Sequence, residues 1–295
     1  MVARGTAFGE ATPYPPPRRE RVSVARVRRL AATPDTRRGA ADLPTVAGTS
    51  LTIADATVSK ARQRRMLAAC DVDPGPLGAT ADASLLGIDC MMAIRKSKVR
   101  APDKLIHLEQ RIQVHTPFAV DEKLGVRAKV EHVEQTPGGE KARAVFDFLG
   151  RDGAVVAAAT ATTLVAEPSW LRDAPAFRGD PRAGHKLVAR RLLNATKVQA
   201  YSEEANSRLH FDPAFAVRNG LRAPVANALM TVTWALEACR AAGAASGAFT
   251  LTARFQSPLF WDDGVDVLVR EEGGKVAAVR CVSSAGALVC EAEVG

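Results

Sequence analysis

The fold is decided by the stretch His210-Phe211-Asp212-Pro213-Ala214-Phe215-Ala216 together with an earlier stretch of the same pattern, Thr80-Ala81-Asp82-Ala83-Ser84-Leu85-Leu86. In each stretch an aspartate precedes apolar residues, as an N-cap residue precedes a helix. Pro213 suits the first position of a helix. We therefore expect one helix start in each stretch, and on this alignment Thr80 occupies the place of His210 in the first copy.

A strongly apolar segment follows each of these starts. The pattern predicts helices over residues 85–98 and 225–242, and Gly243 suits the end of the second one. Both segments are apolar on nearly all sides, which is typical of a helix enclosed by other structure.

Strand-like segments come next, and their turns repeat. The predicted strands cover 104–115, 123–134, 141–149 and 154–165, then 249–257, 265–271, 275–282 and 287–294. The matching turns are Pro117–Asp121 with Pro258–Asp262, Gly138-Gly139 with Gly273-Gly274, and Asp152-Gly153 with Ala285-Gly286. With the helix starts, these landmarks recur after 130, 141, 135 and 133 residues in one order, which indicates a tandem duplication of an α+β unit. Each antiparallel sheet is expected to bury one face on its helix and to pair edge to edge with its twin.

The repeat and the composition divide the chain into four parts. We predict a disordered basic leader over 1–45, a first unit over 46–166, a linker over the Pro-containing residues 167–185, and a second unit over 186–295. The leader holds nine arginines and four acidic residues, which is +5 of the net charge of +8. The remaining body is only mildly basic and has no basic stripe interleaved with aromatic residues, so a nucleic-acid-binding role is not expected.

Composition excludes several other classes. No stretch approaches the roughly 20 apolar residues that a spanning helix needs, and no apolar run near the start indicates a signal peptide. The five cysteines are spread along the chain without zinc-ligand spacing, so we expect buried free thiols, no metal site and no cofactor. The sequence is that expected of a cytoplasmic protein.

The segment Tyr201-Ser202-Glu203-Glu204-Ala205-Asn206-Ser207-Arg208-Leu209-His210-Phe211-Asp212 resembles the active-site segment of MaoC-like, (R)-specific enoyl-thioester hydratases and dehydratases, whose pattern is Tyr-Ser-x-x-x-Gly-Asp-x-Asn-Pro-x-His-x-Asp. Two later blocks are also similar to the family, Pro224–Met230 at the opening of the long helix and Arg254–Phe260 in a strand. The resemblance covers the second unit, whereas the first is similar mainly in layout. It implies a tandem, or double, hot-dog fold, in which an antiparallel sheet in each half wraps around a long central helix.

The resemblance also implies a site, with one departure. His210 matches the catalytic histidine, but the family's catalytic aspartate falls on Ala205 and the preceding glycine falls on Glu204. We therefore expect His210 and Glu204 as the catalytic pair. The expected supporting residues are Asn206, Ser207 and Asp212, and the backbone N–H of Ala228 is expected to bind the thioester oxygen at the helix start.

The predicted activity is a hydratase or dehydratase acting on an acyl thioester of coenzyme A or acyl carrier protein, with His210 as the acid/base. Two alternatives follow from the alanine at position 205: a non-catalytic acyl-thioester-binding or assembly subunit, and a hot-dog thioesterase with Glu204 as the base. The expected partners are the thioester substrate and a second copy of the chain as a homodimer, with neither nucleic acid nor membrane.

Overall fold

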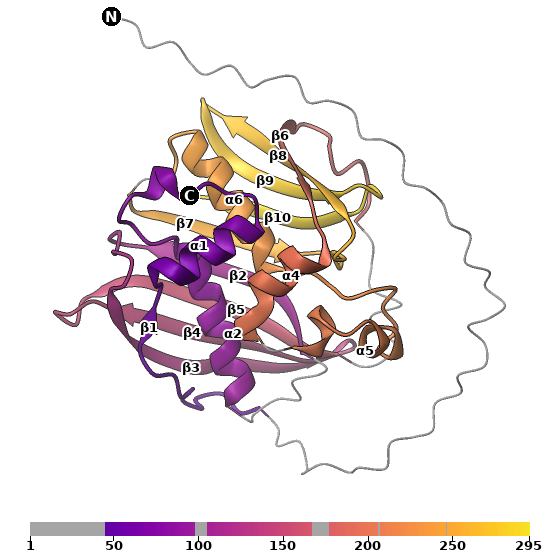
Figure 1. Ribbon diagram of the computed structural model, residues 1–295. Helices are drawn as coiled ribbons and strands as arrows, with labels where there is room; N and C mark the ends of the chain where they lie inside the picture. Colours follow the sequence, from indigo (N-terminus) through magenta and orange to yellow (C-terminus); the bar gives the residue numbers. More distant parts are fainter. Residues whose placement is uncertain (1–44, 98–104, 167–176, 206, 246) are drawn as a thin grey trace, which may run out of the picture. The chain divides into compact units, whose positions relative to one another are not determined.

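The computed structural model describes residues 45–97, 105–166, 177–205, 207–245 and 247–295, and Figure 1 shows its helices and strands. Most of the predicted leader (1–44), the first part of the predicted linker (167–176) and Asn206 lie outside the described residues.

Two sets of elements follow each other along the chain. The first half contains β1 (Ala56–Thr57), α1 (Lys60–Ala69), η2 (Gly75–Leu77), η3 (Ala83–Leu85), α2 (Leu86–Lys96), β2 (Leu105–Val114), β3 (Lys123–Thr136), β4 (Gly139–Leu149) and β5 (Val155–Ala166). The second half contains β6 (Lys186–Leu192), α4 (Ala195–Ser202), η5 (Glu203–Ala205), η6 (Arg208–His210), α5 (Pro213–Arg218), α6 (Leu229–Ala241), β7 (Phe249–Phe255), β8 (Gly264–Glu272), β9 (Lys275–Ser283) and β10 (Leu288–Val294).

The strands form one antiparallel sheet in the order β1-β3-β4-β5-β2-β7-β10-β9-β8-β6. The halves join edge to edge at its centre, where β2 pairs with β7 and Ile112 lies opposite Leu251. This pairing satisfies the open edge that each half would otherwise expose. The predicted edge-to-edge arrangement is therefore confirmed, as are the eight predicted strands to within about three residues at their ends.

The central helices α2 and α6 lie on one face of this sheet (Figure 1). Strand residues alternate between faces, so Gln110 and Ala253 are buried toward the helices while their neighbours Glu109 and Arg254 lie on the opposite face. The two helices and the inner sheet face share one continuous core, in which the largest fully buried side chain is Trp234 of α6.

The halves correspond to each other in a register that differs from the predicted one. Ala81 donates its N–H to Phe118 O over 2.9 Å, and Ala226 donates to Leu259 O over 2.7 Å in the same way. Two isolated bridges complete the match, Thr80 with Ala119 and Val225 with Phe260. Thr80 is therefore equivalent to Val225, and its predicted equivalence to His210 is wrong. Each stretch contains an N-cap aspartate, and aligning the two stretches on these aspartates gave the wrong correspondence.

His210 lies in a segment that is longer in the second half. The N-caps of α1 and α4, Ser59 and Asn194, are 135 residues apart. The capping residues Asp82 and Asn227, which accept the N–H groups of Ser84 and Leu229, are 145 residues apart. The second half thus has ten additional residues between these points, and they allow η5, η6 and α5 to form there.

Helices α1 and α4 and strands β1 and β6 were not predicted. Helix α1 has no clean apolar stripe, because its buried face includes Arg62 and Gln63 as well as Met66 and Leu67. Helix α6 begins at Leu229, four residues after the predicted start, because the chain before it is extended and pairs with the segment before β8.

Candidate functional site

His210 ends the short helix η6 beside the segment that leads into α6. The N–H of Val225 donates to Leu209 O over 3.0 Å, and His210 Nδ1 lies 2.8 Å from Val225 O. A carbonyl oxygen only accepts, so Nδ1 carries the hydrogen and Nε2 keeps its lone pair when the ring is neutral. The main chain before α6 thus fixes both the ring position and the tautomer of His210.

The His210 ring is half-buried, and its surroundings favour the neutral form. Burial lowers the pKa of His210 to about 4, against a smaller opposing effect of the hydrogen bond to Val225. The positive charge of Arg95, which belongs to α2 of the first half, lowers the pKa further. At neutral pH this histidine therefore has an unprotonated Nε2 atom that can accept a proton.

Glu204 is held by the first half rather than by His210. Its Oε2 atom lies 2.8 Å from Arg62 Nε, and its Oε1 atom pairs with Arg65. No hydrogen bond or ion pair joins Glu204 to His210 in the described part of the chain. These contacts do not support Glu204 as the replacement for the missing acid, because both its oxygens are bound to guanidinium groups.

Arg62 joins α1, α2 and the segment that contains Glu204. Its side chain is 8% exposed, and its Nη1 atom lies 2.9 Å from Oδ2 of Asp89 in α2. The same guanidinium group donates to the backbone oxygens of Thr57 and Leu85. Burial raises the pKa of Asp89, and the charge of Arg62 opposes that change. Arg62 therefore connects α1 and α2 of the first half to the Glu204 segment of the second.

The remaining predicted residues have mainly structural contacts. Ser207 is buried, and its carbonyl oxygen accepts the N–H of His210 over 3.0 Å. Asp212 is the N-cap of α5 and accepts the N–H of Phe215 over 2.9 Å, which confirms its predicted capping role. The Arg208 side chain, 2.5 Å from Asp212, helps to lower the pKa of that carboxyl group.

Ala228 stands at the predicted position for binding an oxyanion, at the start of α6. It is the N-cap of the helix, and the next amide, of Leu229, is occupied by Asn227 Oδ1 at 3.1 Å. Among the described residues, the Ala228 amide meets no acceptor. A free N–H at a helix start is suited to a developing negative charge, because the helix dipole adds to it.

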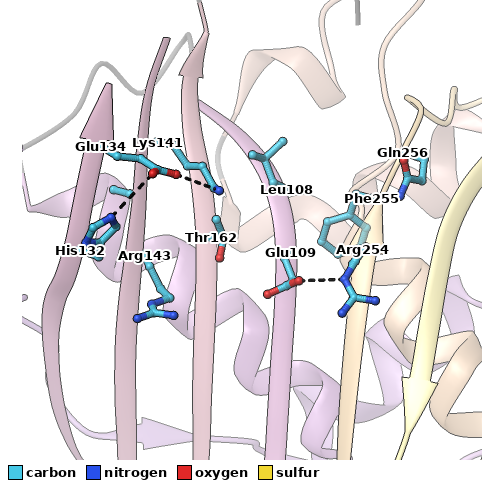
Figure 2. Close-up of a pocket in the computed structure, with 11 residues that line it drawn as sticks. Leu108, Glu109, His132, Glu134, Lys141, Arg143, Thr162, Arg254, Phe255 and Gln256 are labelled. Atoms are coloured by element: carbon cyan, nitrogen blue, oxygen red, sulfur yellow. Dashed lines mark hydrogen bonds and ion pairs between the residues drawn. The ribbon is translucent and has the colours of Figure 1, made fainter. Parts of the chain in front are cut away.

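A groove of about 530 Å³ lies elsewhere, on the sheet face opposite the helices (Figure 2). Its charged groups are in ion pairs: Glu109 lies 3.1 Å from Arg254, Glu134 lies 3.0 Å from Lys141, and Arg143 lies 2.7 Å from Glu131 outside the groove. None of the predicted site residues lines this groove. We therefore do not assign the chemistry to it.

Within the described ranges, no three His, Cys, Asp or Glu side chains are grouped so that they could hold a metal ion. No described helix is long and apolar enough to cross a membrane. All five cysteines are buried free thiols, as predicted.

No family model matches the sequence, and no curated protein matches it significantly. Solved structures do match the fold. HtdX of Mycobacterium tuberculosis has a TM-score of 0.66 at 18% identity, covering 83% of this chain and 99% of its own. A MaoC-like dehydratase of Phytophthora capsici has a TM-score of 0.66 at 16% identity, covering 85% and 98%. Rv0216 of M. tuberculosis, described as a double hot-dog fold, has a TM-score of 0.54 at 16% identity, covering 84% and 95%. The chain therefore has the double hot-dog fold of the MaoC-like proteins, as the resemblance of its sequence implied.

Proposed function

We propose that the protein adds water reversibly to an α,β-unsaturated acyl thioester, with His210 as the acid and base. The observation that carries this proposal is the hydrogen bond from His210 Nδ1 to Val225 O, which leaves Nε2 unprotonated beside the start of α6. The similarity to the MaoC-like dehydratase supports the reaction class. The substrate is a thioester of coenzyme A or acyl carrier protein.

One histidine suffices to balance the reaction. Nε2 of His210 takes a proton from water while the water oxygen forms a bond to Cβ. The Cα=Cβ electron pair moves toward the thioester, and the enolate oxygen accepts a hydrogen bond from the amide N–H of Ala228. The imidazolium then returns the proton from Nε2 to Cα. The product is the 3-hydroxyacyl thioester, and no second carboxylate is consumed or needed, which accommodates Ala205.

In this scheme Glu204 is a tether. Its ion pairs with Arg62 and Arg65 hold the segment that ends in His210. The proposal therefore replaces the expected His210–Glu204 pair with a single proton-transfer residue. It also argues against the thioesterase alternative, because that reaction would need Glu204 as a base.

The test compares two partly buried histidines whose pKa values are both lowered to about 4. His210→Gln keeps an N–H donor for Val225 O but cannot transfer a proton, so hydration of crotonyl-CoA should fall by about 10² or more. His107→Gln is the matched control, because the pKa of His107 is also about 4 but the residue lies in β2, outside the site. The control should retain wild-type hydration. A wild type without hydration, or a loss of less than about tenfold in His210→Gln, contradicts the proposal.

A second candidate function is a non-catalytic thioester-binding subunit. Ala205, at the position of the family's aspartate, favours it. It predicts that crotonyl-CoA binds in calorimetry but is not hydrated, even with long incubation. Turnover that depends on His210 excludes this alternative.

A further inference from the structure

A chain of buried hydroxyl groups connects the segment that leads to His210 with the first half. The hydroxyl oxygen of Tyr201, in the last turn of α4, lies 3.0 Å from Thr233 Oγ1 in α6. Thr233 Oγ1 in turn lies 3.0 Å from Ser84 Oγ in η3, and Ser84 Oγ lies 2.6 Å from Oδ1 of Asp82. All four of these residues are fully buried. The chain therefore runs through the interior from one half to the other.

The carboxylate of Asp82 fixes the direction of these hydrogen bonds. It is paired with a guanidinium group of α6 at 2.9 Å, and a carboxylate accepts hydrogen bonds but donates none. Ser84 has one hydroxyl hydrogen and donates it to Asp82, so Thr233 is the donor to Ser84. A second acceptor for Thr233, Leu229 O, lies farther away at 3.3 Å. With either acceptor the Thr233 hydrogen is used, and Tyr201 is therefore the donor to Thr233.

The short stretch from Tyr201 to His210 is thus bound at both ends to one helix and the residues that lead into it. Tyr201 donates to Thr233, one turn into α6. The His210 ring is bound to Val225 O, four residues before that helix begins. Between these two anchors, the ion pairs of Glu204 hold the stretch to α1. Loss of the Tyr201 anchor therefore frees α4 to shift along α6, and the histidine is only nine residues further along the chain.

We propose that Tyr201 and Thr233 are positioning residues for His210, and that Ser84 and Asp82 of the first half hold their hydroxyl groups in place. The inference rests on the proposed function and extends it to the half without the histidine. In this role none of the four side chains contacts the substrate. They fix α4 on α6, and with it the stretch that carries the proton-transfer residue. Hydrogen bonds in a chain that ends on a charged group strengthen one another, so the buried carboxylate stabilises the whole arrangement.

Hydration of crotonyl-CoA by variants of the full chain tests this role. Tyr201→Phe removes one hydroxyl group and keeps the ring, so kcat should fall by roughly tenfold while KM stays within about twofold of wild type, because a misplaced histidine slows the chemical step without removing a binding group. Thr233→Val should give a similar loss, and Thr233→Ser should restore most of it, since serine keeps the hydroxyl group. Ser283→Ala is the control. Its buried hydroxyl group accepts the N–H of Ala287 over 3.2 Å at the end of β9, so kcat should stay within about twofold of wild type.

Ser84→Ala distinguishes a directed chain from a general loss of packing. Thr233 can then donate to Leu229 O and still accepts the hydrogen bond of Tyr201. The loss in kcat should therefore be about two- to fivefold, smaller than in Tyr201→Phe, because only the connection to the carboxylate is broken. A larger loss in Ser84→Ala than in Tyr201→Phe overturns the proposal, since the effect would not then pass through Tyr201. A folded Tyr201→Phe variant with kcat within about twofold of wild type overturns it as well.

Labelling of the histidines with diethyl pyrocarbonate, located by mass spectrometry, separates this inference from the proposed function. The reagent acylates an unprotonated ring nitrogen, so a displaced segment should make labelling of His210 about threefold faster or more in Tyr201→Phe than in the wild type. His107, half-buried in β2, is the internal control, because a general loosening of the fold would accelerate both histidines.

If the wild type does not hydrate crotonyl-CoA, the hydration proposal fails and the labelling alone judges the positioning role. Faster labelling of His210 without a change at His107 supports that role. Unchanged labelling of His210, or equal acceleration of both histidines, overturns it. Should Tyr201→Phe fail to fold, Ser84→Ala decides by the same comparison.

Discussion

The Nδ1 atom of His210 lies 2.8 Å from the carbonyl oxygen of Val225, four residues before helix α6 begins. This contact links the histidine to the start of the helix, where the Ala228 amide donates to the thioester oxygen in the proposed reaction. A shift at the start of α6 is therefore expected to move the His210 ring as well. The same contact leaves Nε2 of the neutral ring as a proton acceptor.

The first prediction concerns the acid side of the pH–rate profile. The pKa of His210 is lowered to about 4, mainly by burial, so the base form persists down to that pH. We expect kcat/KM for crotonyl-CoA to fall only as the pH approaches about 4, rather than near the ordinary histidine value of 6.5. Stopped assays in overlapping buffers, with folding checked by circular dichroism, measure this limb. A limb near 6.5 would mean that the ring is solvated in the free enzyme.

A second prediction distinguishes a tether from a base at Glu204. Glu204→Gln removes the charge that pairs with Arg62 and Arg65 but leaves His210 in place. We expect kcat to fall by less than about tenfold, and amide exchange across residues 203–210 to become faster, because the segment loses its anchor. Glu203→Gln is the control, since Glu203 is 65% exposed and pairs only with Arg65 among the residues that the structure describes. A loss of about 10² or more in kcat would instead identify Glu204 as a proton-transfer residue.

A third prediction concerns the ion pair between the halves. Asp82 is fully buried, and Arg240, 18% exposed, lies 2.9 Å from it. Arg240→Met leaves an uncompensated buried carboxylate, so we expect it to lower the free energy of unfolding by about 3–5 kcal/mol. Adding Asp82→Asn should recover part of this loss, because the amide oxygen still accepts the N–H of Ser84 without carrying a charge. Urea denaturation of the two single variants and the double variant measures the coupling, and strictly additive losses would contradict it.

Local signals in the sequence predicted much of this fold. Turn residues such as Gly273-Gly274 end strands, and alternating residues mark the strands between them, so eight of the ten strands in the sheet were predicted, all but β1 and β6. Helix α1 was missed because its buried face contains Arg62, whose charge is satisfied only by groups distant in sequence, Asp89 and Glu204. A pattern along one helix does not reveal such partners.

The candidate site, like the fold, was predicted only where local signals in the sequence were sufficient. The motif led to His210, but its carbonyl partner is 15 residues away, and Arg95, whose charge lowers the pKa of His210, is in the other half. The role of Glu204 depends on Arg65, 139 residues earlier in the chain. Only the three-dimensional register of the halves shows that Thr80 corresponds to Val225 rather than to His210. The sequence did not reveal these contacts between the halves, and they account for the differences between the predicted site and the site described above.

A last prediction concerns stability at mildly acidic pH. The His107 ring packs at a tilt of 59° against Phe255 with ring centroids 4.8 Å apart, and its Nε2 atom lies 3.1 Å from Glu109 O. Burial lowers the pKa of His107 to about 4, whereas an unfolded chain has the ordinary value of 6.5. Between these values the unfolded state binds the proton and the native state does not, so stability is lost as the pH falls from 6.5 toward 4.

His107→Gln removes this titration while keeping a hydrogen-bonding side chain. Between pH 7 and pH 5 the wild type should lose on the order of 2 kcal/mol more of its free energy of unfolding than His107→Gln does, because each unit of pKa difference is worth ~1.4 kcal/mol. Urea denaturation at the two pH values measures the difference. His210→Gln should show a similar effect, since the pKa of that ring is also about 4. Parallel losses in wild type and variants would show that both rings are protonated as readily in the native state as in the unfolded one.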